Sequence, residues 1–267
     1  MENIDLKPIG YGIGHLSVIP LRKHPFHTAE MTSQILFGET FVVYEKYYNW
    51  NRVRCSFDNY EGWVNQIEYQ SISEETFVAL SNRQAAIVSD MVEVMYDHTR
   101  NRMFPVLIGS TLPGYKDQAF EIEGIKYSFE GEVTMPSIGT NCRKLIENAW
   151  VFLQSPYLWG GRTPFGIDCS GFVQLVFKLC GISLQRDSSQ QATQGEVVNL
   201  LSESHPGDLA FFDNEDGQIT HVGLMLDNQT IIHASGKVRS DKIDHHGIFN
   251  EETKQYTHKL RLIRRIL

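Results

Sequence analysis

The chain has 267 residues, of which 42% are hydrophobic and 21% are charged, and its net charge is −8. This length fits two or three domains, and the hydrophobic fraction is that of a globular protein with a substantial core. The acidic balance argues against a nucleic-acid partner, and no window of about 18 apolar residues is available to cross a membrane.

The amino-terminal segment MENIDLKPIG carries two acidic residues and lacks the apolar stretch of a secretory signal peptide. We therefore expect a cytoplasmic protein. Its four cysteines, Cys55, Cys142, Cys169 and Cys180, form no CxxC pair. This spacing is consistent with a reducing compartment and with no zinc site.

Residues 1–71 read as short alternating strands separated by turns, among them FVVYEK, NRVRC and EGWVNQIEY. Such spacing predicts a small β-barrel. The barrel is rich in aromatic residues, which either line the bottom of a ligand-binding groove or belong to the core of the barrel. They are Tyr47, Tyr48, Trp50, Tyr60 and Trp63.

Residues 72–136 repeat this pattern less clearly, with strands VEVMYD and FPVLIG and a hairpin that turns at Glu123 and Gly124. We predict a second small barrel there. The stretch 131–140 has the Gly, Pro and Ser content of a linker, and the apolar spacing over 141–154 predicts a helix that Pro156 ends.

The stretch from Tyr157 to Gly181 joins an aromatic, glycine-rich turn to a helix that is apolar on nearly every face. Cys169 lies at the start of this helix, where unpaired N–H groups and the helix dipole favour a thiolate. A cysteine in apolar surroundings can also be an inert core residue. The polar neighbours Asp168 and Ser170 and the surrounding glycines favour a nucleophile.

A cysteine nucleophile needs a base, and the base needs a group that orients it. Two predicted strands, THVGLMLD and QTIIHASG, carry His221 and His233. An antiparallel hairpin with an odd loop places both rings on one face as near neighbours, although either could instead be a core histidine. The final stretch, KLRLIRRIL at 259–267, alternates like a strand at a solvated edge.

The motifs YLWGG, DCSGFV, PGDLAFF, HVG and HASG occur in this order in the second half of the chain. Together they resemble the NlpC family of bacterial cell-wall cysteine peptidases, over about 130 residues from near Ser137 to the end. The resemblance implies a papain-like fold in which Cys169 is the nucleophile, His221 the general base and acid, and His233 the group that orients His221. It also implies that Tyr157 helps to position the substrate and the oxyanion.

The aromatic strands of the first barrel resemble the bacterial SH3-like domains that accompany cell-wall hydrolases. This combination is similar to the γ-D-glutamyl-L-diamino acid endopeptidases, which act on peptides with a free N-terminal L-Ala. By this resemblance Asp168 and Ser170 hold the substrate amine. Glu61 in the first barrel is our candidate for a second carboxylate, with Tyr60 or Tyr96 beside it. A helix cap for Asp168 and a solvated turn for Glu61 are the competing interpretations.

In the same family an Arg, a Gln and a Gly mark a loop beside the substrate cleft, and Arg186, Gln191 and Gly195 match them in this chain. An ordinary surface loop would explain the polar stretch 185–195 equally well.

We therefore predict an α+β protein with domains at 1–71, 72–136 and 137–267. The predicted activity is hydrolysis of the γ-D-Glu–L-diamino acid bond of murein peptides during muropeptide recycling, with no metal and no organic cofactor. The sequence does not indicate the oligomeric state. An N-acetylmuramoyl-L-alanine amidase and an inactive wall-binding protein remain as alternatives. The permuted lipid acyltransferases of the superfamily do not fit, because their His precedes their Cys.

Overall fold

The structure is a computed structural model that describes residues 7–135 and 142–267. The chain divides into two compact units, residues 1–136 and 137–267. The predicted linker 131–140 falls partly outside the described residues, as does the amino-terminal segment on which the absence of a signal peptide is predicted. No helix within 7–135 or 142–267 has the length and apolar character needed to cross a bilayer.

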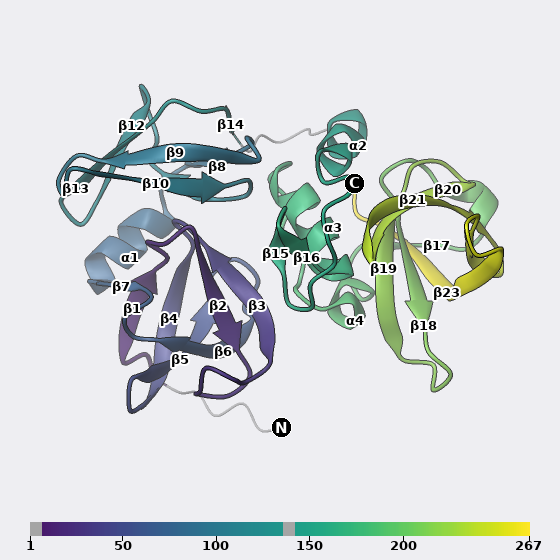
Figure 1. The fold of residues 1–267 in the computed structure, drawn as a ribbon, viewed down its shortest axis with the longest axis horizontal. Coiled ribbons are helices and arrows are strands. Elements are labelled where there is room, and N and C mark those ends of the chain that lie inside the picture. Colours follow the sequence, from purple (N-terminus) through teal and green to yellow (C-terminus); the bar gives the residue numbers. More distant parts are fainter. Residues whose placement is uncertain (1–6, 136–141) are drawn as a thin grey trace. The chain divides into compact units, whose positions relative to one another are not determined.

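The first unit begins with an antiparallel seven-stranded sheet in the order β3-β2-β6-β5-β4-β1-β7 (Figure 1). Alternate residues of these strands point into a core that includes Ile19, Phe41 and Val64. Of the five predicted groove aromatics, Trp50 is buried and Tyr47 and Tyr48 are exposed at a hairpin. The strands are β1 (Gly10–Ile13), β2 (Val18–Arg22), β3 (Met31–Leu36), β4 (Thr40–Tyr47), β5 (Trp50–Cys55), β6 (Glu61–Asn65) and β7 (Gln70–Ile72).

A short helix, α1 (Glu74–Ser81), follows this sheet and was not predicted. Its N-cap is Ser73, whose side chain accepts a hydrogen bond from the Thr76 N–H. Two smaller sheets complete the unit, in the orders β10-β9-β13-β12 and β11-β8-β14. Their strands are β8 (Ala85–Val88), β9 (Val92–Asp97), β10 (Arg102–Leu107), β11 (Thr111–Pro113), β12 (Ala119–Ile122), β13 (Ile125–Phe129) and β14 (Val133–Thr134).

The two β-regions of the first unit share one core. Phe37, from the first region, packs against Phe104 and Tyr127 of the second, with each pair of ring centroids 5.6 Å apart. The next residue, Gly38, has a φ of 77°, and a Cβ there would lie 1.8 Å from the Thr111 carbonyl oxygen. The two regions therefore need this glycine in order to meet.

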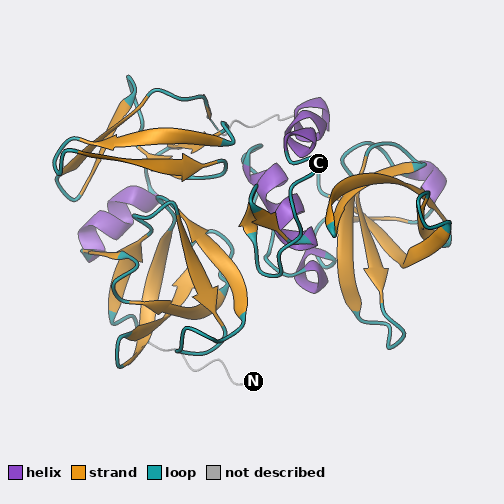
Figure 2. Ribbon diagram, in the orientation of Figure 1, coloured by secondary structure: helices purple, strands orange, loops and turns teal. Residues whose placement is uncertain are grey.

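The second unit places helices beside an antiparallel sheet in the order β17-β23-β18-β19-β20-β21-β22 (Figure 2). Pairing of β22 with β23 joins the strands from β18 to β23 into a closed ring. The helices are α2 (Cys142–Val151), α3 (Cys169–Lys178), α4 (Ser188–Gln191) and the 3-10 helix η1 (Leu201–Glu203). The strands are β15 (Arg162–Thr163), β16 (Gly166–Ile167), β17 (Glu196–Val198), β18 (Leu209–Asp213), β19 (Ile219–Met225), β20 (Thr230–Ser235), β21 (Lys237–Asp244), β22 (Gly247–Asn250) and β23 (Gln255–Arg265).

Helix α3 is buried over its whole length and packs on β19 and β20. The turn that follows its last residue, Lys178, closes at Gly181, whose φ of 79° lets the Ile182 N–H reach back to the Phe177 carbonyl at 3.0 Å. An apolar helix with a glycine stop is what the sequence predicts here.

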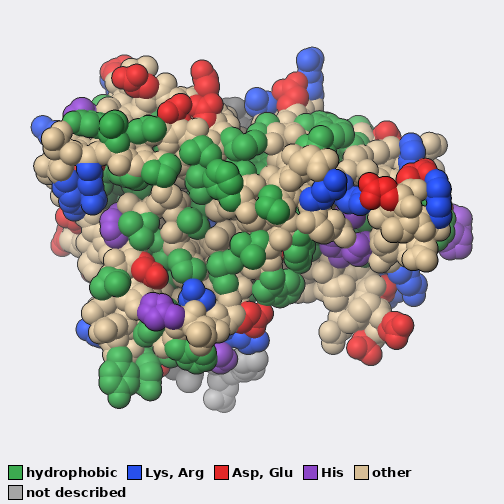
Figure 3. All heavy atoms as spheres, in the orientation of Figure 1, with side chains coloured by type: hydrophobic (Ala, Val, Ile, Leu, Met, Phe, Trp, Pro, Cys, Tyr) green, Lys and Arg blue, Asp and Glu red, His purple; other side chains and the backbone are tan. Residues whose placement is uncertain are grey.

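The prediction that the last strand is a solvated edge is wrong. Strand β23 lies between β17 and β18, and two of its arginines, Arg261 and Arg265, pair with carboxylates of the same unit. Arg265, for example, lies 2.7 Å from the buried Asp208 carboxylate. The charge pattern alone could not distinguish a paired arginine from a solvated one. On the face drawn in Figure 3, basic and acidic side chains are interspersed.

Candidate active site

Cys169 is the first residue of α3, and its side chain is buried. The turn before the helix is tightly packed, because a Cβ on Gly171 would lie 2.4 Å from the Gly161 carbonyl oxygen. Gly161 itself leaves no room for a Cβ beside Gly166. These glycines therefore let the chain pack closely against itself at the start of α3.

The sulfur of Cys169 accepts backbone hydrogen bonds from Val222 and Ser170. Val222 lies on β19 and is the residue after His221. Its bond to the sulfur therefore holds Cys169 against the strand that carries His221. Burial, with the negative charge of Asp168, nevertheless raises the pKa of the Cys169 thiol to about 12. Burial therefore opposes the predicted thiolate, because it outweighs the two backbone hydrogen bonds and the charge of Arg186, which lower this pKa.

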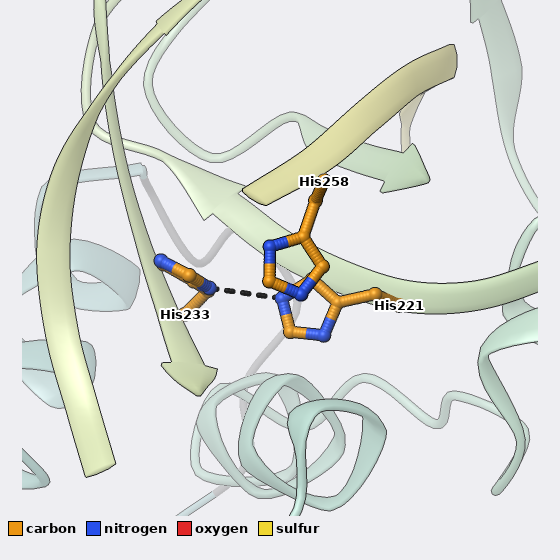
Figure 4. A group of neighbouring side chains, drawn as sticks. All are labelled: His221, His233 and His258. Atoms are coloured by element: carbon orange, nitrogen blue, oxygen red, sulfur yellow. Dashed lines mark hydrogen bonds between the residues drawn. The ribbon is translucent and has the colours of Figure 1, made fainter. Parts of the chain in front are cut away.

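His221 on β19 and His233 on β20 lie on the same face of the sheet. Their register pairs Gly223 with His233, so the two histidines are diagonal neighbours, two residues apart along the ladder. The Nε2 of His221 lies 2.8 Å from the Nδ1 of His233 (Figure 4). Burial, with the neighbouring His258 and His233, holds the pKa of His221 well below its ordinary value. His221 is thus a neutral base at neutral pH.

Asp241 on β21 extends the hydrogen-bonded series that begins with His221 and His233, and the sequence analysis did not identify it. One carboxylate oxygen lies 3.0 Å from the Nε2 of His233, and Arg239 donates to the other at 2.8 Å. Burial raises the pKa of Asp241, but the bonds from His233 and Arg239 outweigh it, and the pKa lies below its ordinary value. Asp241 is therefore an ionised acceptor.

The ionised Asp241 carboxylate determines which ring nitrogens of His233 and His221 carry a proton. Because Asp241 can only accept, the Nε2 of His233 carries its proton, and the Nδ1 of the neutral ring must accept. The Nε2 of His221 then donates to it, which leaves the Nδ1 of His221 with a lone pair. That nitrogen is the one able to take a proton from the Cys169 thiol.

A third imidazole, His258 on β23, lies over His221 and also escaped prediction. The two rings are stacked with centroids 4.0 Å apart and an interplanar angle of 24° (Figure 4). Burial, with the neighbouring His233, lowers the pKa of His258 to about 4. The sequence offers no spacing that relates His258 to the other two histidines. Strand β23 comes near them only because the strands β18 to β23 close into a ring.

Asp168 caps α3 and is held by donors of its own chain. Its carboxylate accepts from the Gly171 N–H at 2.7 Å and the Gly160 N–H at 2.9 Å. Arg186 binds both carboxylate oxygens, at 3.0 and 2.6 Å, and also donates to the Ser170 hydroxyl at 2.9 Å. The helix-capping interpretation is therefore correct for Asp168. Its role with a substrate amine, and that of Ser170, stay predictions.

The surface-loop interpretation of 185–195 is wrong, since the stretch contains α4 and two fully buried side chains. Arg186 and Gln191 have exposed fractions of 1% and 0%. The side-chain amide of Gln191 donates to the carbonyl of Ser170 at 3.0 Å. A direct substrate contact by either residue does not fit this burial, and both instead hold the residues that flank Cys169.

Tyr157 is half-buried before α3. Burial raises its pKa to about 12, and the nearby Cys169 and Asp168 add to the rise. Its phenol therefore stays protonated and able to donate a hydrogen bond, as a role beside the oxyanion requires. That role is a prediction from the resemblance.

Glu61, Tyr60 and Tyr96 lie in the first unit. Glu61 pairs with Arg52 at 2.9 Å and Arg54 at 2.7 Å. Tyr60 packs against the first sheet's core, and the hydroxyl of Tyr96 donates to the Asn101 side chain. Glu61 is thus a paired carboxylate, which is more than the solvated turn residue of the competing interpretation. The predicted contacts of the three with substrate stay predictions.

Comparisons with known proteins match both units. A family model described as the NlpC/P60 family matches residues 154–261, and one described as the bacterial dipeptidyl-peptidase Sh3 domain matches residues 21–66. A gamma-D-glutamyl-L-lysine dipeptidyl-peptidase of Bacillus cereus is 26% identical over 240 residues, which cover 80% of this chain and 70% of that protein. The protein of the same name from Bacillus subtilis is 27% identical over 226 residues, 79% and 74% of the two chains.

Among solved structures, an NlpC/P60 family protein from Bacillus cereus aligns with a TM-score of 0.81. The alignment covers 96% of this chain and 99% of that one at 20% sequence identity. It supports the α+β fold, with a papain-like unit after an SH3-like domain.

Proposed function

Because the chain carries an NlpC/P60 peptidase domain and a bacterial dipeptidyl-peptidase SH3 domain, we propose that it is a cysteine endopeptidase of free cell-wall peptides. The bond cut is the one between γ-D-Glu and the L-diamino acid, in peptides that begin with L-Ala. The names of the two Bacillus relatives support this bond. The observation that carries the chemistry is the hydrogen-bonded series His221–His233–Asp241, together with the backbone bond from Val222, the residue after His221, to the Cys169 sulfur.

The reaction begins from a neutral thiol and a neutral imidazole. The Nδ1 of His221 takes the proton of Cys169 as the sulfur attacks the amide carbonyl carbon. His233 accepts a hydrogen bond from the Nε2–H of the His221 imidazolium. The negative charge of Asp241 balances the positive charge that develops on His221. Backbone N–H groups at the start of α3 stabilise the oxyanion, where one such donor is worth about 10²–10³ in rate.

Collapse of the tetrahedral intermediate breaks the C–N bond. His221 returns its proton to the leaving amine, and the acyl group stays on the sulfur as a thioester. His221 then takes a proton from water as the water oxygen attacks the thioester carbonyl. When the C–S bond breaks, His221 gives this proton to the sulfur, which restores the neutral Cys169 thiol. The products are an L-Ala-γ-D-Glu dipeptide and the remainder of the peptide, which begins with the diamino acid.

A free amino terminus on the substrate is part of the proposal. An ammonium that leaves water for the protein needs acceptors, because an unpaired buried charge is costly. Asp168 already accepts from two backbone N–H groups and from Arg186, so it would share its oxygens with the substrate amine.

Incubation with defined peptides tests the proposal. The panel contains L-Ala-γ-D-Glu tripeptides ending in L-Lys or in diaminopimelate, their N-acetyl forms and the muramyl-linked forms, with products read by mass spectrometry. We expect release of L-Ala-γ-D-Glu from the free tripeptides only. Equal cleavage of the acetylated forms would refute amine recognition, and release of L-Ala from the muramyl group would establish the amidase instead.

A further inference from the structure

Three histidines from three strands meet at one point in the second unit. The ligand nitrogens of His221, His233 and His258 all lie within 4.8 Å of one another (Figure 4). We call these three residues the His cluster. The proposed peptidase reaction uses His221 and His233 but gives His258 no role.

The chemistry of the His cluster suits a divalent transition metal. Imidazole nitrogen is a preferred ligand of Zn²⁺, and three histidines with one open position form a known zinc ligand set. A ligating histidine usually donates its other ring N–H to a carboxylate, which orients the ring. His233 has this arrangement, because its Nε2 bonds to Asp241, which Arg239 holds in turn.

The nitrogens lie near enough to share one ion, provided that the His258 ring turns out of its stack on His221. A Zn–N bond of about 2.0–2.1 Å limits two nitrogens on one ion to a separation of about 4.2 Å. The nitrogens of His221 and His233, now 2.8 Å apart, would separate slightly to admit the ion between them. His258 is only partly buried, so its ring has room to rotate into position.

We propose that the His cluster binds Zn²⁺ or a similar divalent metal ion, and that the bound ion switches the peptidase off. The inhibitory part rests on the proposed function. A metal on the Nε2 of His221 replaces the proton there, and in a neutral imidazole that proton moves to Nδ1. The lone pair that would accept the Cys169 proton is then gone. No proton is lost overall, and removal of the metal restores the base.

Metal binding is tested directly, without the reaction, on the full chain. Calorimetric titration with Zn²⁺ uses a Cys142→Ser, Cys169→Ala background, which removes the exposed thiol and the thiol beside the His cluster. We expect binding of about one Zn²⁺ per chain, weakened at least about tenfold by His258→Phe and by His258→Gln. The matched control, His245→Ala with His246→Ala, removes an exposed histidine pair elsewhere and should leave the affinity unchanged.

Unchanged Zn²⁺ affinity in both His258 variants would overturn the proposed metal site. If His258→Phe fails to fold, the affinity of His258→Gln decides the question. In the chain with Cys169 intact, Zn²⁺ should inhibit tripeptide cleavage and a chelator should restore it. The concentration of Zn²⁺ that halves the metal-free rate should be at least about tenfold higher for His258→Phe than for the wild type. Loss of wild-type activity on chelation would overturn the inhibitory role. Zn²⁺ binding without cleavage of any peptide would refute the proposed function while leaving the metal site in place.

Discussion

At the scale of single residues, burial sets the protonation of the reacting pair. Burial raises the pKa of Cys169 and lowers that of His221, so both are neutral before substrate binds. A neutral pair needs no charge separation in a desolvated site. The proton transfer is then coupled to attack, and the orientation of His221 decides whether it can occur.

The neutral thiol predicts how alkylation of Cys169 depends on pH. Below a pKa of about 12, the thiolate fraction grows about tenfold per pH unit. The rate of iodoacetamide modification at Cys169, followed by peptide mapping, should rise accordingly from pH 6 to pH 9. A rate that stays flat over this range would show a preformed thiolate and contradict the neutral pair.

Asp241 should be a positioning residue, because it fixes the proton on the Nε2 of His233. An asparagine there can present either its oxygen or its amide group, and the wrong tautomer then becomes possible. Asp241→Asn should lower kcat/KM by at least about tenfold, less than the ~10⁴ seen when a triad aspartate contacts the base directly. The acidic limb of the pH profile should move, and Asp241→Glu should restore part of the rate.

Asp227→Asn is the control for this measurement, since Asp227 is an exposed-turn carboxylate that accepts from the Gln229 N–H. It should leave kcat/KM unchanged. An Asp241→Asn protein with wild-type kcat/KM would remove Asp241 from the mechanism.

At the scale of elements, the start of α3 is fixed by a buried ion pair. Arg186 and Asp168 have side-chain exposed fractions of 1% and 6%, and their closest atoms are 2.6 Å apart. Removing one partner of such a pair leaves an uncompensated buried charge, whereas exposed ion pairs contribute little. The support of Cys169 thus depends on a residue 17 positions further along the chain.

Arg186→Ala should therefore lower the free energy of unfolding by about 3–5 kcal/mol, measured by urea denaturation. Arg143→Ala removes an exposed pair with Glu147 on α2 and should cost less than about 1 kcal/mol. Equal, small effects of the two substitutions would show that the pair at α3 is not a structural requirement.

At the scale of the whole molecule, the two β-regions of the first unit depend on a common core. Phe37, Ile13 and Ile72 from the first region belong to the same cluster as the strands of the second. A fragment of residues 1–136 should unfold in one cooperative transition. A fragment of residues 1–72 should not, because an uncovered Phe37 alone forfeits about 1.5–3 kcal/mol out of a typical total of about 5–15 kcal/mol.

Urea denaturation followed by tryptophan fluorescence distinguishes the fragments, since Trp50 and Trp63 lie in both. A cooperative transition in the short fragment, at the same midpoint as in the long one, would show that the first region is an independent domain.

Local patterns predicted those features that depend on neighbours in sequence. The strands that carry His221 and His233 were found from alternation, and the helix stop at Gly181 and the turn at Glu123 and Gly124 from their residue types. Asp241 and His258 were missed because they reach the site only through strand pairings. Burial, which governs the Cys169 pKa, likewise depends on the packed unit and not on the helix start alone.

Cys169 as the nucleophile of peptide cleavage is the central claim, and one substitution tests it most directly. Cleavage of the free L-Ala-γ-D-Glu-L-diamino acid tripeptides, followed by mass spectrometry, should fall at least about 10⁴-fold in Cys169→Ala. Cys180→Ala, which removes another buried thiol of the same unit, should retain activity within a few-fold. Turnover by Cys169→Ala at the wild-type rate would contradict the assignment of the nucleophile and the mechanism built on it.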